Sequence, residues 1–177
     1  MKILALDPGT VTGVAYARAG HMPYLDTWRL PEGQGAEVGA FFAEFERLLT
    51  SAIIEGQPDI LVFEAPFVGP KLLSNMNACR RVIGLPCVIE LIAHKMKLEV
   101  AECNLMTVRS HFVGKGRCDK HETIAACRRA GVTPADDHQA DAFACFWWTV
   151  ACQAPEQLAF YDPLQVAARR AEMAAQA

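Results

Sequence analysis

The sequence predicts an α/β protein with a mixed five-stranded sheet, in which three antiparallel strands precede parallel strands and helices flank the sheet. Short apolar runs bounded by turn residues alternate with longer segments of helical periodicity. The order of these segments (three strands, helix, strand, helix, strand, helices) is typical of a mixed α/β sheet. The 177 residues fit one domain, and the 52% hydrophobic content is enough for a sizeable core.

The N-terminal segment contains three strand patterns joined by tight turns. Lys2–Asp7 is an apolar run with hydrophobic residues on both faces, as expected for a strand inside a sheet. A turn at Pro8-Gly9-Thr10 follows, and Thr12–Ala17 resumes the strand pattern. A third short strand is predicted for Tyr24–Leu30. Together these strands predict an antiparallel meander.

The next two elements are predicted to be a helix and a buried strand. Residues 36–54 place apolar side chains at helical spacing along one face. Asp59–Phe63 is a compact apolar strand that ends at Glu64. A helix between two strands favours a parallel crossover connection.

A long helix is expected at Leu72–Met96, followed by a strand at Leu98–Cys103. Gly84 and Pro86 lie inside the helical pattern and predict a kink or a break. The remaining helices are expected at Leu105–Phe112, Lys120–Ala130, Asp137–Cys152 and Leu164–Ala175. The folded domain is therefore assigned to residues 1–152, and residues 153–177 to a C-terminal tail with a peripheral helix.

Charge is unevenly distributed along the chain, although the net charge is only −3. Between Lys71 and Arg129 there are eleven Lys or Arg against five Asp or Glu, whereas the rest of the chain has six against fifteen. This asymmetry indicates one basic surface on an otherwise acidic protein. A solvated helix face is the alternative explanation.

The seven cysteines fit neither a zinc site nor a disulfide framework, because their number is odd and no CxxC pair occurs. Most have apolar neighbours, which predicts reduced core thiols in a cytoplasmic protein. No run of eighteen apolar residues suggests a transmembrane helix, so no membrane partner is expected.

Three carboxylates occupy positions where a buried charge needs an explanation. Asp7 and Glu64 directly follow apolar strands, and Asp141 lies one turn into a very apolar helix. His138 and Asp137, three and four residues earlier, share the helical face of Asp141. Convergence of these groups would form an anionic pocket with raised pKa values unless a cation entered it.

Such an oxygen-rich pocket suits hard divalent cations, Mg²⁺ or Mn²⁺. Two ions per site can activate water and stabilise the leaving oxygen in phosphodiester cleavage. Asp7 is the expected bridging ligand because it would come from the central strand, and His138 is expected to ligate an ion or to position the attacking water.

Each acidic residue also has a structural explanation. Asp7 before Pro-Gly-Thr can be a turn residue, and Glu64 can be a solvated strand end. Asp136 is best explained as a helix N-cap. Asp141 is harder to explain in this way, because Ala-Phe-Ala-Cys-Phe-Trp-Trp follows it.

Three segments resemble motifs of the RuvC-type Holliday-junction resolvases, which belong to the RNase H-like nuclease superfamily. The resemblance covers Met1 to about Thr149 and rests on LALDPGTVTGVAY, ILVFEAPF and HQADAFACF. It implies the RNase H-like fold and a metal-binding catalytic quartet of Asp7, Glu64, His138 and Asp141. His138 stands where many members have a carboxylate, so Asp137 is kept as an alternative ligand.

The same resemblance implies DNA-binding residues. Phe67 matches an aromatic that stacks near the opened junction centre, with a core position as the alternative. The segment VRSHFVGKGRCDKHE is similar to a basic segment of the family, and Arg80 and Arg81 either extend its surface or are solvated helix charges. The full set of predicted DNA-binding residues is Phe67, Arg80, Arg81, Arg109, Lys115, Arg117 and Lys120.

The family resemblance implies a crossover junction endodeoxyribonuclease that makes paired symmetric nicks and leaves a 5′-phosphate and a 3′-hydroxyl. It implies branched DNA as the partner and a homodimer formed through the helix Leu72–Met96, which could instead be buried within one chain. A nuclease acting on flaps, forks or RNA–DNA hybrids is the alternative.

Two other functions are weaker alternatives. The segment DPGTVTG also resembles the first phosphate loop of actin-like ATPases, but the chain is short for those proteins. A non-catalytic DNA-binding relative would leave the carboxylates unexplained.

Overall fold

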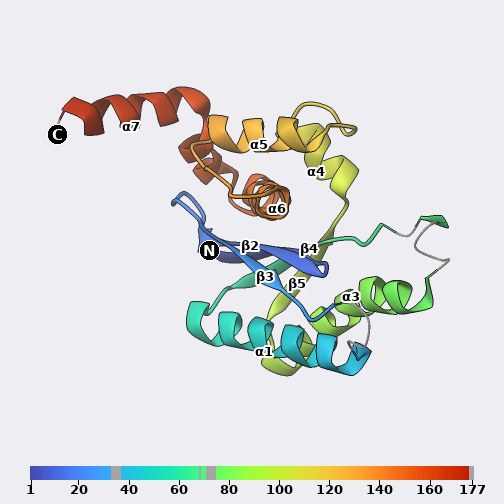
Figure 1. The fold of residues 1–177 in the computed structure, drawn as a ribbon. Helices are drawn as coiled ribbons and strands as arrows, with labels where there is room; N and C mark the ends of the chain where they lie inside the picture. Colours follow the sequence, from blue (N-terminus) through green and yellow to red (C-terminus); the bar gives the residue numbers. More distant parts are fainter. Residues whose placement is uncertain (33–36, 68, 71–74, 176–177) are drawn as a thin grey trace.

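The computed structural model describes residues 1–32, 37–67, 69–70 and 75–175. A five-stranded sheet of order β3-β2-β1-β4-β5 separates two groups of helices (Figure 1). Its strands are β1 (Lys2–Asp7), β2 (Val11–Arg18), β3 (Tyr24–Arg29), β4 (Ile60–Glu64) and β5 (Glu99–Cys103). The predicted mixed sheet is therefore confirmed, with boundaries within two residues of those expected from the sequence.

The antiparallel half of the sheet is a meander, as predicted. β1 pairs with β2 from Lys2↔Arg18 to Asp7↔Gly13, and β2 pairs with β3 from Val11↔Arg29 to Tyr16↔Tyr24. β4 and β5 extend the sheet on the other side of β1 in parallel. β1 is consequently the central strand, and its carboxyl end lies beside that of β4.

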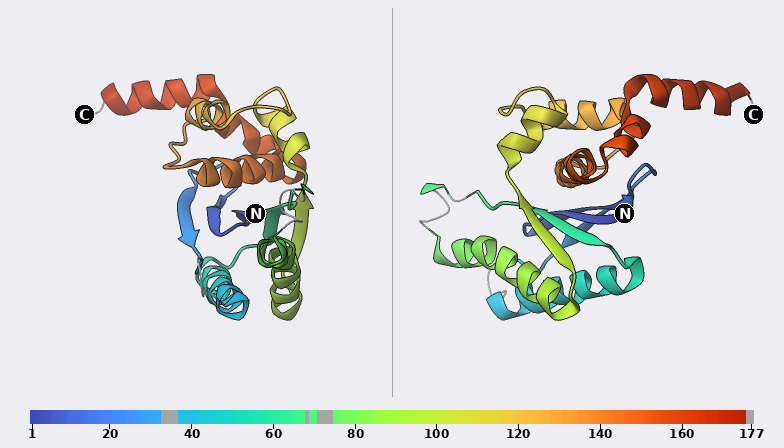
Figure 2. Two further views of the ribbon diagram at one scale, coloured as in Figure 1. Left: turned by 45° about the vertical axis from the view of Figure 1, so that its right-hand side comes forward. Right: turned by 180° about the vertical axis from the view of Figure 1, so that it is seen from behind.

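One face of the sheet is covered by α1 (Val38–Gly56) and α3 (Met76–Met96) (Figures 1 and 2). Buried side chains on α1 recur every four residues and face the sheet: Phe41, Phe45, Leu49 and Ile53. They pack with Leu4, Leu6 and Phe63 from the strands. This regular apolar stripe explains why the segment is helical.

The long helix differs from the prediction in where it begins and in its course at Pro86. The expected helix began at Leu72; α3 begins at Met76, and positions 72–74 lie outside the described residues. The predicted break does not occur, since α3 continues through Pro86 to Met96. Leu85 and Ile89 on either side of the proline are fully buried against the sheet, and this packing favours a continuous helix over the local preference.

The opposite face is covered by α6 (Asp137–Gln153), with α4 (Leu105–Phe112) and α5 (Lys120–Arg129) packed over α6 (Figure 2). An unpredicted 3₁₀ helix, Pro155–Tyr161, leads to α7 (Pro163–Ala175). Tyr161 from this segment packs in a T-shaped arrangement against Phe143 and Phe146 of α6, and its hydroxyl donates a hydrogen bond to the His21 carbonyl. The segment after residue 152 thus contributes Ala154 and Tyr161 to the core, and Val166 of α7 is also buried.

All seven cysteines are free. Only Cys103, Cys127 and Cys145 are buried, while Cys87 and Cys152 are exposed, so the expectation of mostly core thiols was wrong. The apolar neighbours of the exposed pair in the sequence belong to helix faces directed inward. Among the helices of the described residues, none has the length and apolar character that a bilayer-spanning segment requires.

Candidate active site

Two of the predicted carboxylates lie side by side at the edge where parallel strands end. The β1–β4 ladder runs up to the pair Leu6↔Phe63, and Asp7 and Glu64 are the next residue on each strand. Neighbouring strands are about 4.8 Å apart, so side chains at matched positions are close neighbours. The apolar runs ILAL and ILVF are buried between two helix layers, which fixes where both strands end.

Glu64 is the most perturbed carboxyl at this edge. Its Oε2 atom is buried and has no hydrogen-bond partner among the described residues. Burial, together with the negative charges of Asp7 and Asp141, raises the pKa of Glu64 to about 9. Glu64 therefore carries a proton at neutral pH unless a cation offsets the surrounding charge.

The N-terminal turn of α6 brings the other two predicted residues to the same edge. It lies directly on Gly13, the register partner of Asp7: a Cβ atom at position 13 would be 1.9 Å from the His138 carbonyl oxygen. Only glycine allows this close approach of helix to strand. Asp7, His138 and Asp141 are thus held together by a backbone contact that the sequence analysis did not identify.

His138 is hydrogen-bonded to Asp7, with 2.8 Å between Nδ1 and Oδ2. This bond raises the pKa of His138, although partial burial opposes the shift. Asp137, the alternative site residue, forms an ion pair with Lys120. The ion pair lowers the pKa of Asp137. Of the two neighbours, the structure brings His138 to Asp7.

Asp141 is bound by Arg109 of α4, whose NH2 group lies 3.0 Å from both carboxylate oxygens. Both side chains are largely buried, with 16% of Arg109 and 13% of Asp141 exposed. Burial raises the pKa of Asp141, and the Arg109 charge opposes this rise. Arg109 was predicted as a phosphate contact; in the structure it neutralises a carboxylate of the site.

The start of α6 is fixed to β3 by a small polar network. Asp136 is the N-cap, as predicted, and accepts a 2.8 Å hydrogen bond from the Gln139 amide. Its other oxygen accepts a 2.9 Å bond from the Thr27 hydroxyl, which itself accepts from Gln139 Nε2 at 3.0 Å. Thr27 and Gln139 were not predicted, because 112 residues separate them in the sequence. The network sets the direction in which α6 presents His138 and Asp141.

Asp136→Ala is expected to lower the free energy of unfolding by about 1–2 kcal/mol, the usual cost of losing an N-cap together with a second hydrogen bond. Urea denaturation measures this loss. Asp162→Ala is the matched control: Asp162 accepts a bond from the Leu164 amide at the exposed start of α7, so its loss is expected to cost less. Equal losses in the two variants would contradict a special role for the Asp136 network.

No family model matches this chain, and a search of curated proteins found no relative. Solved structures do match. Thermus thermophilus RuvC has a TM-score of 0.65 at 17% identity, and the alignment covers 82% of this chain and 90% of that chain. The chain has the RNase H-like fold of RuvC. T. thermophilus RuvC in complex with a Holliday junction substrate gives a TM-score of 0.66 at 19% identity over the same shares.

A second resolvase has the same fold. The yeast mitochondrial Holliday junction resolvase Ydc2 matches with a TM-score of 0.61 at 10% identity, covering 95% of this chain and 81% of that chain. At these identities the likeness establishes the fold and not the activity. The RuvC-like fold nevertheless explains why widely separated carboxylates meet at one edge of the sheet.

The predicted DNA-binding residues of this RuvC-like chain differ in their surroundings. Phe67 is 85% exposed, so the alternative of a core position was wrong. Arg80 and Arg117 are exposed. Lys115 and Lys120 form ion pairs with Glu122 and Asp137, and the Arg81 guanidinium lies 5.3 Å from the centre of the Phe41 ring. The basic segment is therefore partly neutralised by its own acidic residues.

The carboxyl edge of the RuvC-like sheet has the donor chemistry of a magnesium or manganese site. Carboxylate oxygens suit hard divalent cations, and the buried Oε2 of Glu64 lacks any donor to satisfy it. Within the described residues, however, no three His, Cys, Asp or Glu side chains are arranged so that they could hold one ion together. Asp7 is engaged by His138 and Asp141 by Arg109, which accounts for this arrangement.

Proposed function

We propose that this protein is a Holliday-junction resolvase: a divalent-metal-dependent endodeoxyribonuclease that makes paired symmetric nicks at four-way DNA junctions in recombination and repair. The observation that carries the proposal is the buried, unsatisfied carboxyl of Glu64 between the charges of Asp7 and Asp141. These groups lie at the carboxyl edge of a fold whose solved examples include a RuvC in complex with a Holliday junction substrate.

Once the pairs His138–Asp7 and Arg109–Asp141 separate, the metal, Mg²⁺ or Mn²⁺, would be held as two ions per site by Asp7, Glu64, Asp141 and His138. When bound, the ions would lower the pKa of water and stabilise the leaving oxygen. The chain's own groups supply the remaining steps. Proton release from Glu64 gives a second charged strand-end carboxylate, and His138 Nδ1 is placed to hold or return a proton at Asp7 Oδ2.

Arg109 has a role that follows from its position. Its guanidinium neutralises Asp141 at 3.0 Å and lies beside Glu64, whose pKa its charge lowers. If Asp141 binds a cation, Arg109 becomes available to the phosphate that is cleaved, where it would stabilise developing negative charge. Exposed Phe67, Arg80 and Arg117, together with the ion-paired lysines, would contact the junction arms.

A homodimer would place two such sites on one junction, and α3 is the proposed contact. Its apolar side chains Met76, Ile83 and Leu91 are exposed, in addition to the row that packs on the sheet. An isologous interface matches the two-fold character of a four-way junction. Two sites facing one centre would give symmetric nicks with 5′-phosphate and 3′-hydroxyl ends.

The test is a cleavage assay on end-labelled four-way junctions, splayed arms, flaps, RNA–DNA hybrids and linear duplex. Each substrate is incubated with the full chain in Mg²⁺, Mn²⁺ or EDTA. Asp7→Asn is the inactive variant, and Glu46→Gln, a carboxylate on the exposed face of α1, is the matched control. We expect paired, ligatable nicks on the four-way junction alone, lost in EDTA and in Asp7→Asn but retained in Glu46→Gln.

Cleavage of flaps, forks or hybrids at least as fast as of junctions would replace the substrate assignment and keep a metal-dependent nuclease. Junction binding without cleavage in either metal would contradict the nuclease proposal itself.

A further inference from the structure

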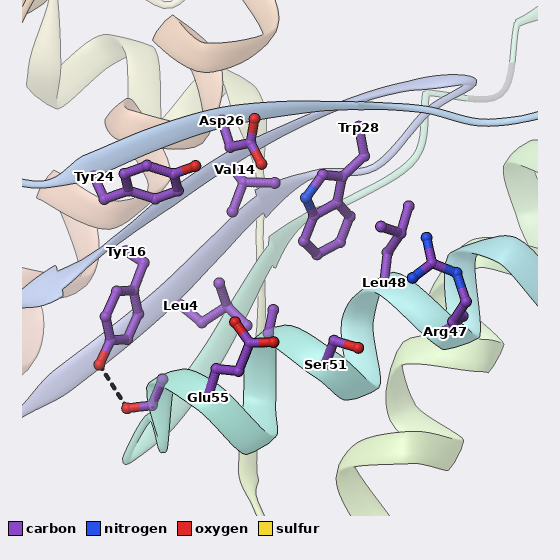
Figure 3. A pocket seen from close by; sticks show the side chains of 12 residues that line it. Leu4, Val14, Tyr16, Tyr24, Asp26, Trp28, Arg47, Leu48, Ser51 and Glu55 are labelled. Atoms are coloured by element: carbon purple, nitrogen blue, oxygen red, sulfur yellow. Dashed lines mark hydrogen bonds between the residues drawn. The ribbon is translucent and has the colours of Figure 1, made fainter.

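The side of the sheet opposite α6 carries a cavity of about 490 Å³ between β2, β3 and the C-terminal half of α1 (Figure 3). Leu4, Val14 and Leu48 form its apolar floor. Because side chains alternate along a strand, Tyr24 and Asp26 of β3 point to the same face and line this cavity. The sheet lies between the cavity and the carboxylate edge of the candidate active site, so the proposed nuclease chemistry does not use it.

Two carboxylates face this cavity without a cationic partner. Glu55 makes no hydrogen bond or ion pair with any described residue, and Asp26 accepts only from the Thr27 amide at 2.8 Å. Arg47 also lines the cavity, but it donates two hydrogen bonds to Glu44, at 2.8 and 2.7 Å, so its charge is already compensated. The two carboxylates therefore leave the cavity with a net negative charge, which is partly offset by Lys2, whose Nζ donates a 3.1 Å hydrogen bond to the Gly56 carbonyl at the cavity edge.

The end of α1 receives its cation from β1, where Lys2 Nζ donates to the Gly56 carbonyl. A helix C-terminus carries partial negative charge and is stabilised by basic side chains, yet the last turn of α1 contains none. It contains Glu55 instead, an arrangement that is unfavourable for the helix itself. Lys2 occupies the helix carbonyl, and Glu55 itself makes no hydrogen bond or ion pair with a described residue.

Aromatic side chains form the cavity walls. Tyr16 is oriented by a 2.6 Å hydrogen bond from its hydroxyl to the Gly56 carbonyl, and Tyr24 is 64% exposed. Trp28 completes the wall beside Val14 (Figure 3). Aromatic faces attract cations, and a planar guanidinium also stacks on them while it pairs with carboxylates in a bidentate manner.

We propose that this cavity binds an arginine side chain from an extended segment of a partner protein. The guanidinium would pair with Glu55 and Asp26 between the aromatic rings, and its aliphatic stem would lie on the apolar floor. β3 is the last strand of the sheet, so a second chain can lie along it next to the cavity. This location favours a polypeptide over a free amine.

The test uses the full ¹⁵N-labelled chain and the capped peptide acetyl-Val-Arg-Val-amide as the probe. The Trp28 indole N–H and the Gly56 amide report binding by their NMR shifts. We expect saturable shifts at both signals, and at least about tenfold weaker binding in Glu55→Gln and in Asp26→Asn. Glu46→Gln is the matched control, because nine residues place position 46 on the opposite face of α1, and its affinity should equal that of wild type.

Three results would overturn the inference. Equal binding of a peptide with norleucine or lysine in place of arginine would exclude a guanidinium site. Equal weakening in Glu55→Gln and Glu46→Gln would reduce the effect to general surface charge. Agmatine binding as tightly as the peptide would assign the cavity to a small free cation and not to a polypeptide. We expect junction cleavage to be unaffected in all of these variants, so failure here is distinguishable from failure of the proposed nuclease function.

Discussion

Gly13→Ala is expected to lower the free energy of unfolding by about 3 kcal/mol and to abolish any metal-dependent cleavage. The added Cβ would lie 1.9 Å from the carbonyl oxygen and 2.2 Å from the carbonyl carbon of His138. Both are backbone atoms, so no side-chain rotation relieves the clash. The start of α6 must move away from β2, which separates His138 and Asp141 from Asp7.

Urea denaturation and junction cleavage measure the two effects of Gly13→Ala. Gly39→Ala is the matched control, because the residue is in the first turn of α1 and, among the described residues outside its own helical turn, no atom lies within 4 Å of its Cβ position. That variant should be neutral or slightly stabilising, since alanine favours helix more than glycine does. A Gly13→Ala protein with wild-type stability would show that α6 tolerates displacement and that the close contact is unimportant.

Glu64→Gln is expected to stabilise the metal-free protein above neutral pH while it reduces cleavage on the order of a thousandfold or more. The folded pKa of Glu64, about 9, lies above its ordinary value of 4.5. The folded state therefore holds the proton more tightly than the unfolded state, and the wild type loses stability as pH rises from about 4.5 to about 9. Glutamine is neutral throughout this range and avoids the loss.

Denaturation in EDTA at several values between pH 4 and pH 9 tests the stability part. The difference between variant and wild type should be small at the acidic end and grow to several kcal/mol at the alkaline end. Added Mg²⁺ should restore stability to the wild type but less to Glu64→Gln. Glu102→Gln, an exposed position on β5, is the control and should follow the wild type. A pH-independent difference would mean that Glu64 is not protonated in the fold.

The sequence predicted the sheet well because its strands are short apolar runs with clear ends. Lys2–Asp7 was predicted with the observed boundaries, and both strand-end carboxylates followed directly from it and from the run that ends at Glu64. The break predicted at Pro86 does not occur, because tertiary packing outweighs the local preference of proline. The helix stays continuous because Leu85 and Ile89 are buried against the sheet.

The contacts that assemble the candidate site were less accessible to prediction. Arg109 reaches Asp141 only because α4 packs on α6, and nothing in the local pattern distinguishes it from a surface arginine. Thr27 and Gln139 meet only after the sheet and α6 come together. Gly13 did carry a signal, since a glycine inside a strand often marks close approach of another backbone.

The pairs Arg109–Asp141 and His138–Asp7 mean that two carboxylates of the site already have partners within the chain. A divalent cation that binds at this edge must displace Arg109 and His138 from the carboxylates. Its apparent affinity is therefore its own attraction to the carboxylates minus the attraction of these two side chains. Occupancy of the site would therefore follow the free concentration of that ion. Under our proposal, activity would be set by the supply of the ion and by proton concentration, because every proton that His138 keeps opposes the entering cation.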